Sequence, residues 1–198
     1  MKNFILGVLA AMILSNGAAA VEKVLPQPQT EGGMPLMQAI KQRRAVRDFS
    51  NKPIDEQTLS NLLWATYGVS NEEGKRTIPT AKNLKELEVY VAKDDGVWLY
   101  DADNNKLEQV SDQNILDLFN TQDYMQNAPL NLIFTGDRDG KFVDMHAGSA
   151  YQNAGLYATS VGLNNVVRAW FDHEAVEKAL KLPETKKVIV SQAFGWGN

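Results

Sequence analysis

Three arginines lie within five residues of this chain, at Arg43, Arg44 and Arg47. A guanidinium group carries a permanent charge and a planar set of donors that matches phosphate oxygens, so this spacing favours a phosphate-bearing ligand. The alternative is a solvated basic helix end, because arginine near a helix C-terminus also satisfies the last backbone carbonyls. Taken alone, the cluster leaves both interpretations open.

The other residue types offer little catalytic chemistry. The chain contains no cysteine, which excludes disulfides and a thiol nucleophile, and its two histidines lack metal-ligand spacing. The sequence contains no dinucleotide-binding glycine motif, no P-loop and no nucleophile elbow. The sequence therefore predicts no metal site, and it favours either a binding module or a protein whose cofactor performs the chemistry.

Residues 1–20 have the pattern of a secretory signal peptide. Lys2 precedes an apolar run over residues 4–14 that is too short to span a bilayer, and small residues precede a cleavage position after Ala20. We therefore expect an exported protein, periplasmic or secreted, without a stable membrane anchor. Loss of Lys2 changes the formal net charge from −4 to −5, which disfavours nucleic acid as a partner.

The rest of the sequence predicts an extended tether over residues 21–34 and then one domain over residues 35–198. Helices are expected where apolar residues recur every three to four positions, and strands where they alternate or form short runs. Expected helices begin near residues 36, 55, 115, 147 and 172, and expected strands span residues 87–92, 97–100, 106–110, 130–135, 166–170 and 188–194. Hairpin-like neighbours at 87–110 argue against a purely parallel sheet, so the predicted fold is α+β, with a mixed sheet surrounded by helices.

Several residues define the expected helices more closely. Asp55 and Asp172 are good N-caps, and Gly162 is expected to end the long helix before it. Within that helix, small residues follow helical spacing at Ala147, Ala150, Ala154 and Ala158. Because small side chains let another helix approach closely, we expect a tight helix–helix contact there.

The arginine cluster, followed by Asp48-Phe49 and a capped helix, resembles the N-terminal signature of the FMN-dependent nitroreductase family. Residues 79–83 (Pro-Thr-Ala-Lys-Asn) are similar to the family's loop that contacts the flavin from the partner subunit. Gln122, ahead of Ala128-Pro129, resembles the shorter azoline-oxidising branch. Residues 152–163 look like the long central helix of the dimer, and residues 166–172 resemble the strand that faces the reactive edge of the flavin.

This resemblance covers residues 35–198 and implies an obligate homodimer with two FMN sites at the subunit interface. Arg43 and Arg44 would hold the FMN phosphate, and Arg47 would lie near the ribityl chain and the N1/O2 edge. Gln122 would bond the pyrimidine edge, and flavin N5 rather than a side chain would carry the chemistry. The implied cofactor-binding residues are Arg43, Arg44, Ala45, Arg47, Pro79, Thr80, Ala81, Lys82, Asn83, Gln122, Ala169 and Trp170, the last two through backbone groups near N5 and O4.

The chain departs from larger family members in two places. No Lys or Arg lies near the C-terminus to close the phosphate site, and only a short link joins the strand at 130–135 to the long helix. We therefore expect a more open site in which the three arginines carry most of the phosphate recognition.

The resemblance implies an exported FMN-dependent oxidoreductase that cycles its flavin between oxidised and two-electron-reduced forms. NAD(P)H is the implied reductant, and a nitroaromatic or a quinone is the implied acceptor. Oxidation of a substrate, as in the azoline-forming branch, is equally compatible with the sequence. The alternatives are a non-enzymatic flavin-binding or storage protein and an exported scaffold without a cofactor.

Overall fold

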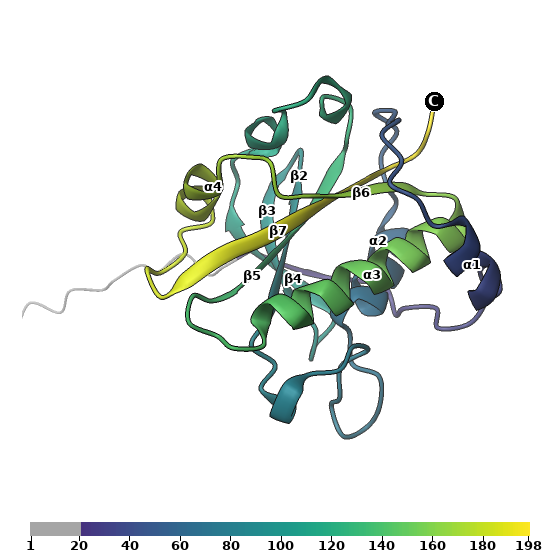
Figure 1. The fold of residues 1–198 in the computed structure, drawn as a ribbon, viewed down its shortest axis with the longest axis horizontal. Coiled ribbons are helices and arrows are strands. Elements are labelled where there is room, and N and C mark those ends of the chain that lie inside the picture. The colour runs from purple at the N-terminus through teal and green to yellow at the C-terminus, as the bar shows by residue number, and fades with distance from the viewer. Residues whose placement is uncertain (1–20) are drawn as a thin grey trace, which may run out of the picture.

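The structure, a computed structural model, describes residues 21–198, and the expected signal peptide lies outside this range. The main elements are helices α1 to α4 and strands β1 to β7 (Figure 1). Their bounds are β1 Glu22–Val24, α1 Leu36–Gln42, α2 Glu56–Tyr67, β2 Glu88–Lys93, β3 Gly96–Asp101, β4 Lys106–Ser111, β5 Leu130–Asp137, α3 Val143–Val161, β6 Asn164–Arg168, α4 His173–Ala179 and β7 Lys186–Gly195. Within this range, none of the helices combines the length and apolarity needed to cross a membrane.

The strands form a seven-stranded sheet in the order β1-β4-β3-β2-β5-β7-β6. All neighbouring strands pair antiparallel. The expected α+β class is therefore seen, but across residues 21–198 the sheet is antiparallel instead of mixed. The reason is long-range: α3 connects β5 to β6, which run in the same direction, and β7 inserts between them and pairs with both.

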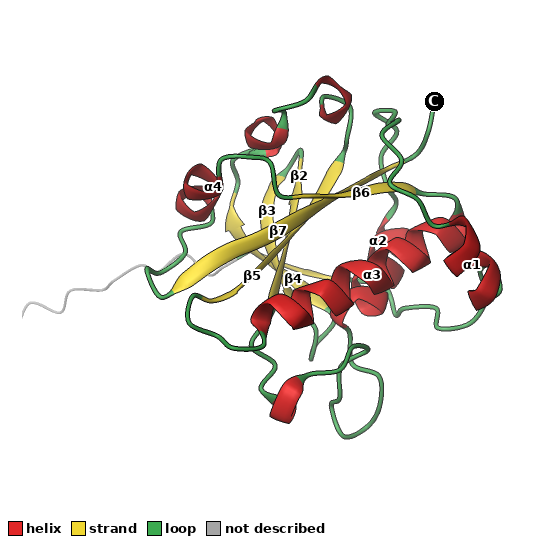
Figure 2. Ribbon diagram, viewed as in Figure 1, coloured by secondary structure: helices red, strands yellow, loops and turns green. Residues whose placement is uncertain are grey.

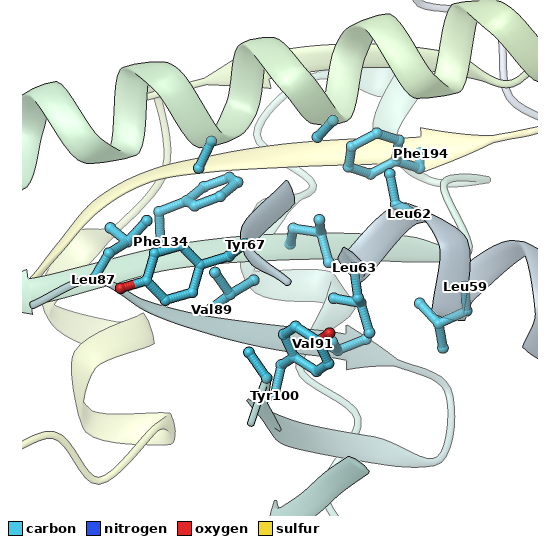
Figure 3. Packing of buried hydrophobic residues seen from close by; sticks show 14 of the residues in the cluster. Leu59, Leu62, Leu63, Tyr67, Leu87, Val89, Val91, Tyr100, Phe134 and Phe194 are labelled. Atoms are coloured by element: carbon cyan, nitrogen blue, oxygen red, sulfur yellow. The ribbon is translucent and has the colours of Figure 1, made fainter. Parts of the chain in front are cut away.

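Helices cover both faces of the sheet, and each face has its own apolar core (Figure 2). On one face α2 packs against α3, and Figure 3 shows Leu62 of α2 next to Phe194 of β7 and Tyr67 of α2 next to Phe134 of β5. On the other face α4 and two short 3₁₀ turns bury an aromatic and aliphatic cluster that includes Phe119, Phe171 and Val176. The sheet thus forms a rigid layer between the two cores.

The helix signals in the sequence are confirmed at several positions. Asp55 accepts a hydrogen bond from the backbone of Thr58 at 2.9 Å, and Asp172 accepts one from Ala175 at 3.0 Å. Gly162 ends α3 in the left-handed conformation, with φ of 82°. The alanine stripe of α3 is fully buried in the core that it shares with α2, so the expected close helix contact lies within the chain.

Three expected segments differ from the structure. Residues 21–34 do not form a free tether, because β1 pairs with β4, Leu25 is buried, and the Pro26 carbonyl accepts from Ser60. The helix expected near residue 115 is only a 3₁₀ turn, Leu116–Phe119. The strand expected over residues 166–170 lies two residues earlier, so the Ala169–Trp170 backbone follows the end of β6.

Candidate functional site

The arginine cluster lies directly after α1, and Arg44 closes that helix. The Arg43 N–H bonds the Ala39 carbonyl at 2.8 Å. Arg44 donates through Nη1 to the carbonyls of Lys41 and Arg43, at 2.9 and 2.8 Å. Nη1 of Arg44 therefore acts as a helix-end donor, whereas the other guanidinium donors of Arg44 make no hydrogen bond within residues 21–198. The chain then runs beside β6, where the Val46 N–H bonds the Asn165 carbonyl at 3.0 Å.

Arg43 reaches a buried polar group beneath α3. Gln192 of β7 donates from Nε2 to Asn165 Oδ1 at 3.0 Å, and both side chains are almost fully buried. A Cβ atom built on Gly155 would lie 3.2 Å from Asn165 Oδ1 and 3.5 Å from Cδ of Arg43. The absence of a side chain at Gly155 therefore lets Arg43 lie close to the helix and to this amide pair. Among the described residues, Gln192 Oε1 is buried and accepts no hydrogen bond.

Arg47 and Gln122 meet around Tyr124. The Arg47 guanidinium carbon lies 5.8 Å from the centre of the Tyr124 ring, within cation–π distance. The Tyr124 hydroxyl donates to Gln122 Oε1 at 2.7 Å. Gln122 precedes a 3₁₀ turn, Asp123–Met125. The structure thus brings together two predicted site residues, Arg47 and Gln122, that are far apart in the sequence.

Trp170 joins the same region through its backbone. Its carbonyl accepts from the Thr121 hydroxyl at 2.7 Å and from Arg168 Nη2 at 3.0 Å. The Trp170 residue itself is 70% exposed. Ala169, also predicted, is exposed beside it. The Trp170 carbonyl therefore lies beside the Thr121–Gln122 segment, and Tyr124 connects that segment to Arg47.

Arg168 was missed by sequence reasoning, although it lies inside a predicted strand. No motif marks it, and its buried position follows only from the pairing of β6 with β7 and from the turn at residues 116–119 that covers it. Its guanidinium lies 5.7 Å from the centre of the Tyr124 ring, so two arginines approach one aromatic side chain.

The charge pattern at this end of the molecule is unbalanced. Across residues 21–198, Arg76 and Arg138 form ion pairs with carboxylates, whereas Arg43, Arg44, Arg47 and Arg168 form none. The carboxylate of Asp48 lies within the cluster's segment, but it accepts from the backbone and side chain of Asn198, at 3.3 and 2.6 Å. Arg43, Arg44 and Arg47 therefore have no carboxylate partner among the described residues, and their remaining guanidinium donors suit an anionic ligand.

The predicted loop at residues 79–83 lies elsewhere in the chain. Its turn, Ala81–Asn83, has positive φ angles at Lys82 and Asn83. The Ala81 N–H donates to Nε2 of His146 at 2.8 Å, and the His146 ring is buried at the start of α3. Gly155, which Arg43 approaches, comes nine residues later on that helix, a separation of about 13 Å along its axis. Pro79, Thr80 and the rest of this loop are therefore not brought to the arginines within one chain.

Comparison with known proteins places the chain among nitroreductases. A model of the nitroreductase family matches residues 40–196. The sequence is 32% identical over 170 residues to a candidate nitroreductase of Methanocaldococcus jannaschii. The matched region covers 75% of this chain and 85% of that protein. The fold matches a candidate nitroreductase from Ralstonia eutropha with a TM-score of 0.83 and 32% identity, over 89% of this chain and 90% of that one. It also matches, in fold alone, a chain of the Escherichia coli microcin synthetase complex McbBCD, with a TM-score of 0.67 and 21% identity, over all of this chain and 85% of that one.

Proposed function

This chain belongs to the nitroreductase family, and from this premise we propose that it is an FMN-dependent oxidoreductase. The observation that supports the proposal most directly is that Arg43, Arg44, Arg47 and Arg168 have no carboxylate partner among the described residues, and that Arg47 and Arg168 lie beside Tyr124 and Gln122. Bound FMN would supply two-electron chemistry, accepting a hydride from a donor and passing electrons to an acceptor.

The residues of the site have roles that fit a flavin mononucleotide. Arg43 and Arg47 have guanidinium groups available for the phosphate and the ribityl chain, and Arg44 contributes the donors that α1 does not use. The Gln122 amide offers a donor to the pyrimidine edge, because its oxygen already accepts from Tyr124. Ala169 and Trp170 are exposed residues, which leaves room beside them for the reactive edge of the ring system.

We further propose that two copies of the chain complete each site. The loop at residues 79–83 is held about 13 Å along α3 from Arg43, so a second subunit would supply it. Residues on the outer side of α1 are apolar and uncovered, with Leu36, Met37 and Ile40 exposed by 64%, 74% and 48%. Exposed apolar groups of this kind are typical of a protein interface.

For the biological setting, we propose export by the N-terminal signal peptide and a small-molecule electron donor and acceptor. NAD(P)H is the donor that we expect to reduce the flavin, and a nitroaromatic or a quinone is the expected acceptor. A flavin storage protein is the competing function, and it differs from an enzyme in one measurable respect: its flavin would not be reduced by these donors.

The first test is the visible spectrum of the purified protein comprising residues 21–198. We expect the absorbance of oxidised flavin, either as isolated or after addition of FMN. Anaerobic mixing with NADH or NADPH should then bleach this absorbance, and a nitroaromatic or quinone should restore it. A colourless protein that takes up no added FMN would refute the proposal, and a yellow protein that no donor or candidate substrate bleaches would favour storage.

A variant pair tests where the phosphate binds. Arg43→Ala should weaken FMN binding about ten- to hundredfold, because a hydrogen bond to a charged group contributes roughly 1.5–3 kcal/mol. Lys141→Ala removes the same charge from an exposed position before α3 and should leave the affinity within about twofold. Equal FMN affinities of the two variants in fluorescence titrations would contradict this assignment.

A further inference from the structure

Arg168 is a buried cation without a counter-charge. It is 4% exposed, and within residues 21–198 no carboxylate lies within ion-pair distance of it. Removing a guanidinium group from water is costly unless hydrogen bonds or an opposite charge compensate it. The hydrogen-bond acceptors around Arg168 therefore indicate the role of this buried charge.

These acceptors come from two segments that are far apart in the sequence. From the segment at residues 119–122, Arg168 bonds the Phe119 carbonyl at 2.6 Å, the Thr121 hydroxyl, and Gln122 Oε1 at 3.4 Å. From the segment after β6 it bonds the Trp170 carbonyl at 3.0 Å. Because the Thr121 hydroxyl also donates to that carbonyl, the guanidinium group and Thr121 together clamp one segment against the other.

All acceptors in this set are neutral, so they hydrogen-bond the guanidinium group but do not neutralise its positive charge. The remaining guanidinium nitrogen, Nε, is buried and has no hydrogen-bond partner among the described residues. The face of Tyr124 is the other nearby group, and it is also approached by Arg47. A fixed positive charge in a water-poor environment stabilises negative charge on a neighbouring group much more than the same charge in water does.

We propose that Arg168 is a positioning residue of the flavin site: it clamps residues 119–122 to the Trp170 backbone, and its uncompensated charge favours the reduced flavin over the oxidised one. This inference rests on the proposed function, because Gln122 and the Trp170 backbone are the groups proposed to face the flavin ring. The two parts of the role can be separated, because the clamp requires the guanidinium fork whereas the electrostatic effect requires only a positive charge.

Two variants divide the role accordingly. Arg168→Lys keeps a positive charge, but its compact ammonium group cannot bridge the same set of acceptors. Arg168→Met removes the charge and the fork while retaining a long apolar chain. Arg138→Met is the matched control, because that guanidinium group is ion-paired with Glu177 and bonds the carbonyls of Glu184 and Lys186, near the beginning of β7 and away from this site.

The first measurement is hydrogen exchange of the FMN-free proteins, which does not depend on flavin binding. In both Arg168 variants, the amides of residues 119–126 should exchange at least tenfold faster than in the wild type, while those of β5 remain protected. Exchange that rises equally across the whole chain, or that does not rise at residues 119–126, would overturn the clamp.

The second measurement is the two-electron reduction potential of bound FMN. Arg168→Met should reduce the preference for reduced over oxidised FMN by tenfold or more, which corresponds to a drop of about 30 mV. Arg168→Lys should lower the reduction potential by less than half of that amount, and Arg138→Met should have the reduction potential of the wild type. Equal potentials in the two Arg168 variants would overturn the electrostatic role. A wild-type protein that takes up no FMN would refute the proposed function instead, and the exchange measurement would still decide the clamp.

Discussion

At the scale of single residues, His146 holds the loop that the family resemblance marks for the flavin. Nε2 accepts from the Ala81 N–H, which requires Nδ1 to carry the proton in the neutral ring. Nδ1 lies 3.6 Å from Oε1 of Glu86, and neither atom has a hydrogen-bond partner among the described residues. The Ala81 bond is therefore the main polar contact that connects this ring to the loop.

Replacing His146 with phenylalanine tests this contact. The substitution keeps an aromatic ring but leaves the Ala81 N–H without its acceptor, which should lower the free energy of unfolding by about 1–3 kcal/mol. Urea unfolding followed by circular dichroism measures the loss. Phe142→Leu, at the half-buried position before α3, is a control for ring packing and should cost less. A His146→Phe protein as stable as the wild type would show that the loop does not depend on this bond.

Residues with a motif could be predicted from the sequence, whereas residues defined by tertiary contacts could not. Arg47 and Gln122 were predicted from family signatures, and the structure brings them together around Tyr124. Arg168 and His146 carry no local signal, because their partners lie 49 and 65 residues away in the chain. The buried unpaired charge of Arg168 in particular becomes visible only when the covering turn is in place.

At the scale of secondary structure, the N-terminus of α2 depends on one carboxylate. The backbone N–H of Thr58, and next its hydroxyl, donate to Asp55 and lower the pKa of that carboxyl below its usual value. Because the pKa of Asp55 is lower in the folded state than in the unfolded state, its charge stabilises the fold fully above the unfolded pKa of about 3.9. This contribution is lost as the pH falls through the folded pKa.

Asp55→Ala should therefore cost about 1 kcal/mol of unfolding free energy at pH 7, the usual contribution of an N-cap side chain. The difference from the wild type should be smaller at about pH 3, below the unfolded pKa, because the unfolded state then binds a proton more readily than the folded state does. Asp55→Asn retains an oxygen acceptor without the charge, and its difference from Asp55→Ala should change little with pH. Urea titrations at both pH values measure these differences, and a constant wild-type advantage over Asp55→Ala would contradict the assignment.

The C-terminus of α3 depends on backbone conformation alone. Gly162 has φ of 82°, and a Cβ atom built there would meet nothing within 4 Å. Gly162→Ala should therefore lower stability by roughly 1–2 kcal/mol through the left-handed conformation and not through a clash. Gly162→Asn should lose less, because asparagine adopts this conformation more readily. If the alanine variant unfolds at the same urea concentration as the wild type, conformational strain does not limit the helix end.

Elements with strong local signals were predicted well, and those determined by pairing were not. Caps and apolar spacing gave α2 and α3, because these signals lie within the helices themselves. The three-residue strand β1 is too short to show alternation, and its place beside β4 depends on a partner about 84 residues away. The antiparallel sheet likewise follows from the insertion of β7 between β5 and β6, which no local pattern encodes.

At the scale of the whole molecule, the proposed site is divided between two parts of the surface. Arg43 and the segment around Arg47 lie near the C-terminal half of α3, whereas residues 79–83 are fixed at its N-terminal end. Both parts are attached to the same rigid helix, so a hinge within the chain would have to break α3 to bring them together. The simplest way to complete the site is a second copy of the chain, and size-exclusion chromatography with light scattering of the protein comprising residues 21–198 should give twice the mass of the single chain.

A heterodimer of two variant chains tests whether each site combines residues of both subunits. Arg43→Ala impairs one part of the site, and Asn83→Asp impairs the other while retaining a residue type that tolerates the positive φ of 57° at this position. If each site combines Arg43 of one subunit with the loop of the other, a heterodimer of the two variants carries both defects in one site and none in the second. Co-expression with two affinity tags should then yield heterodimers that bind about half the wild-type amount of FMN with wild-type affinity, while both homodimers bind weakly. If both parts of the site came from the same chain, every site in the heterodimer would carry one defect, and no wild-type affinity would be recovered.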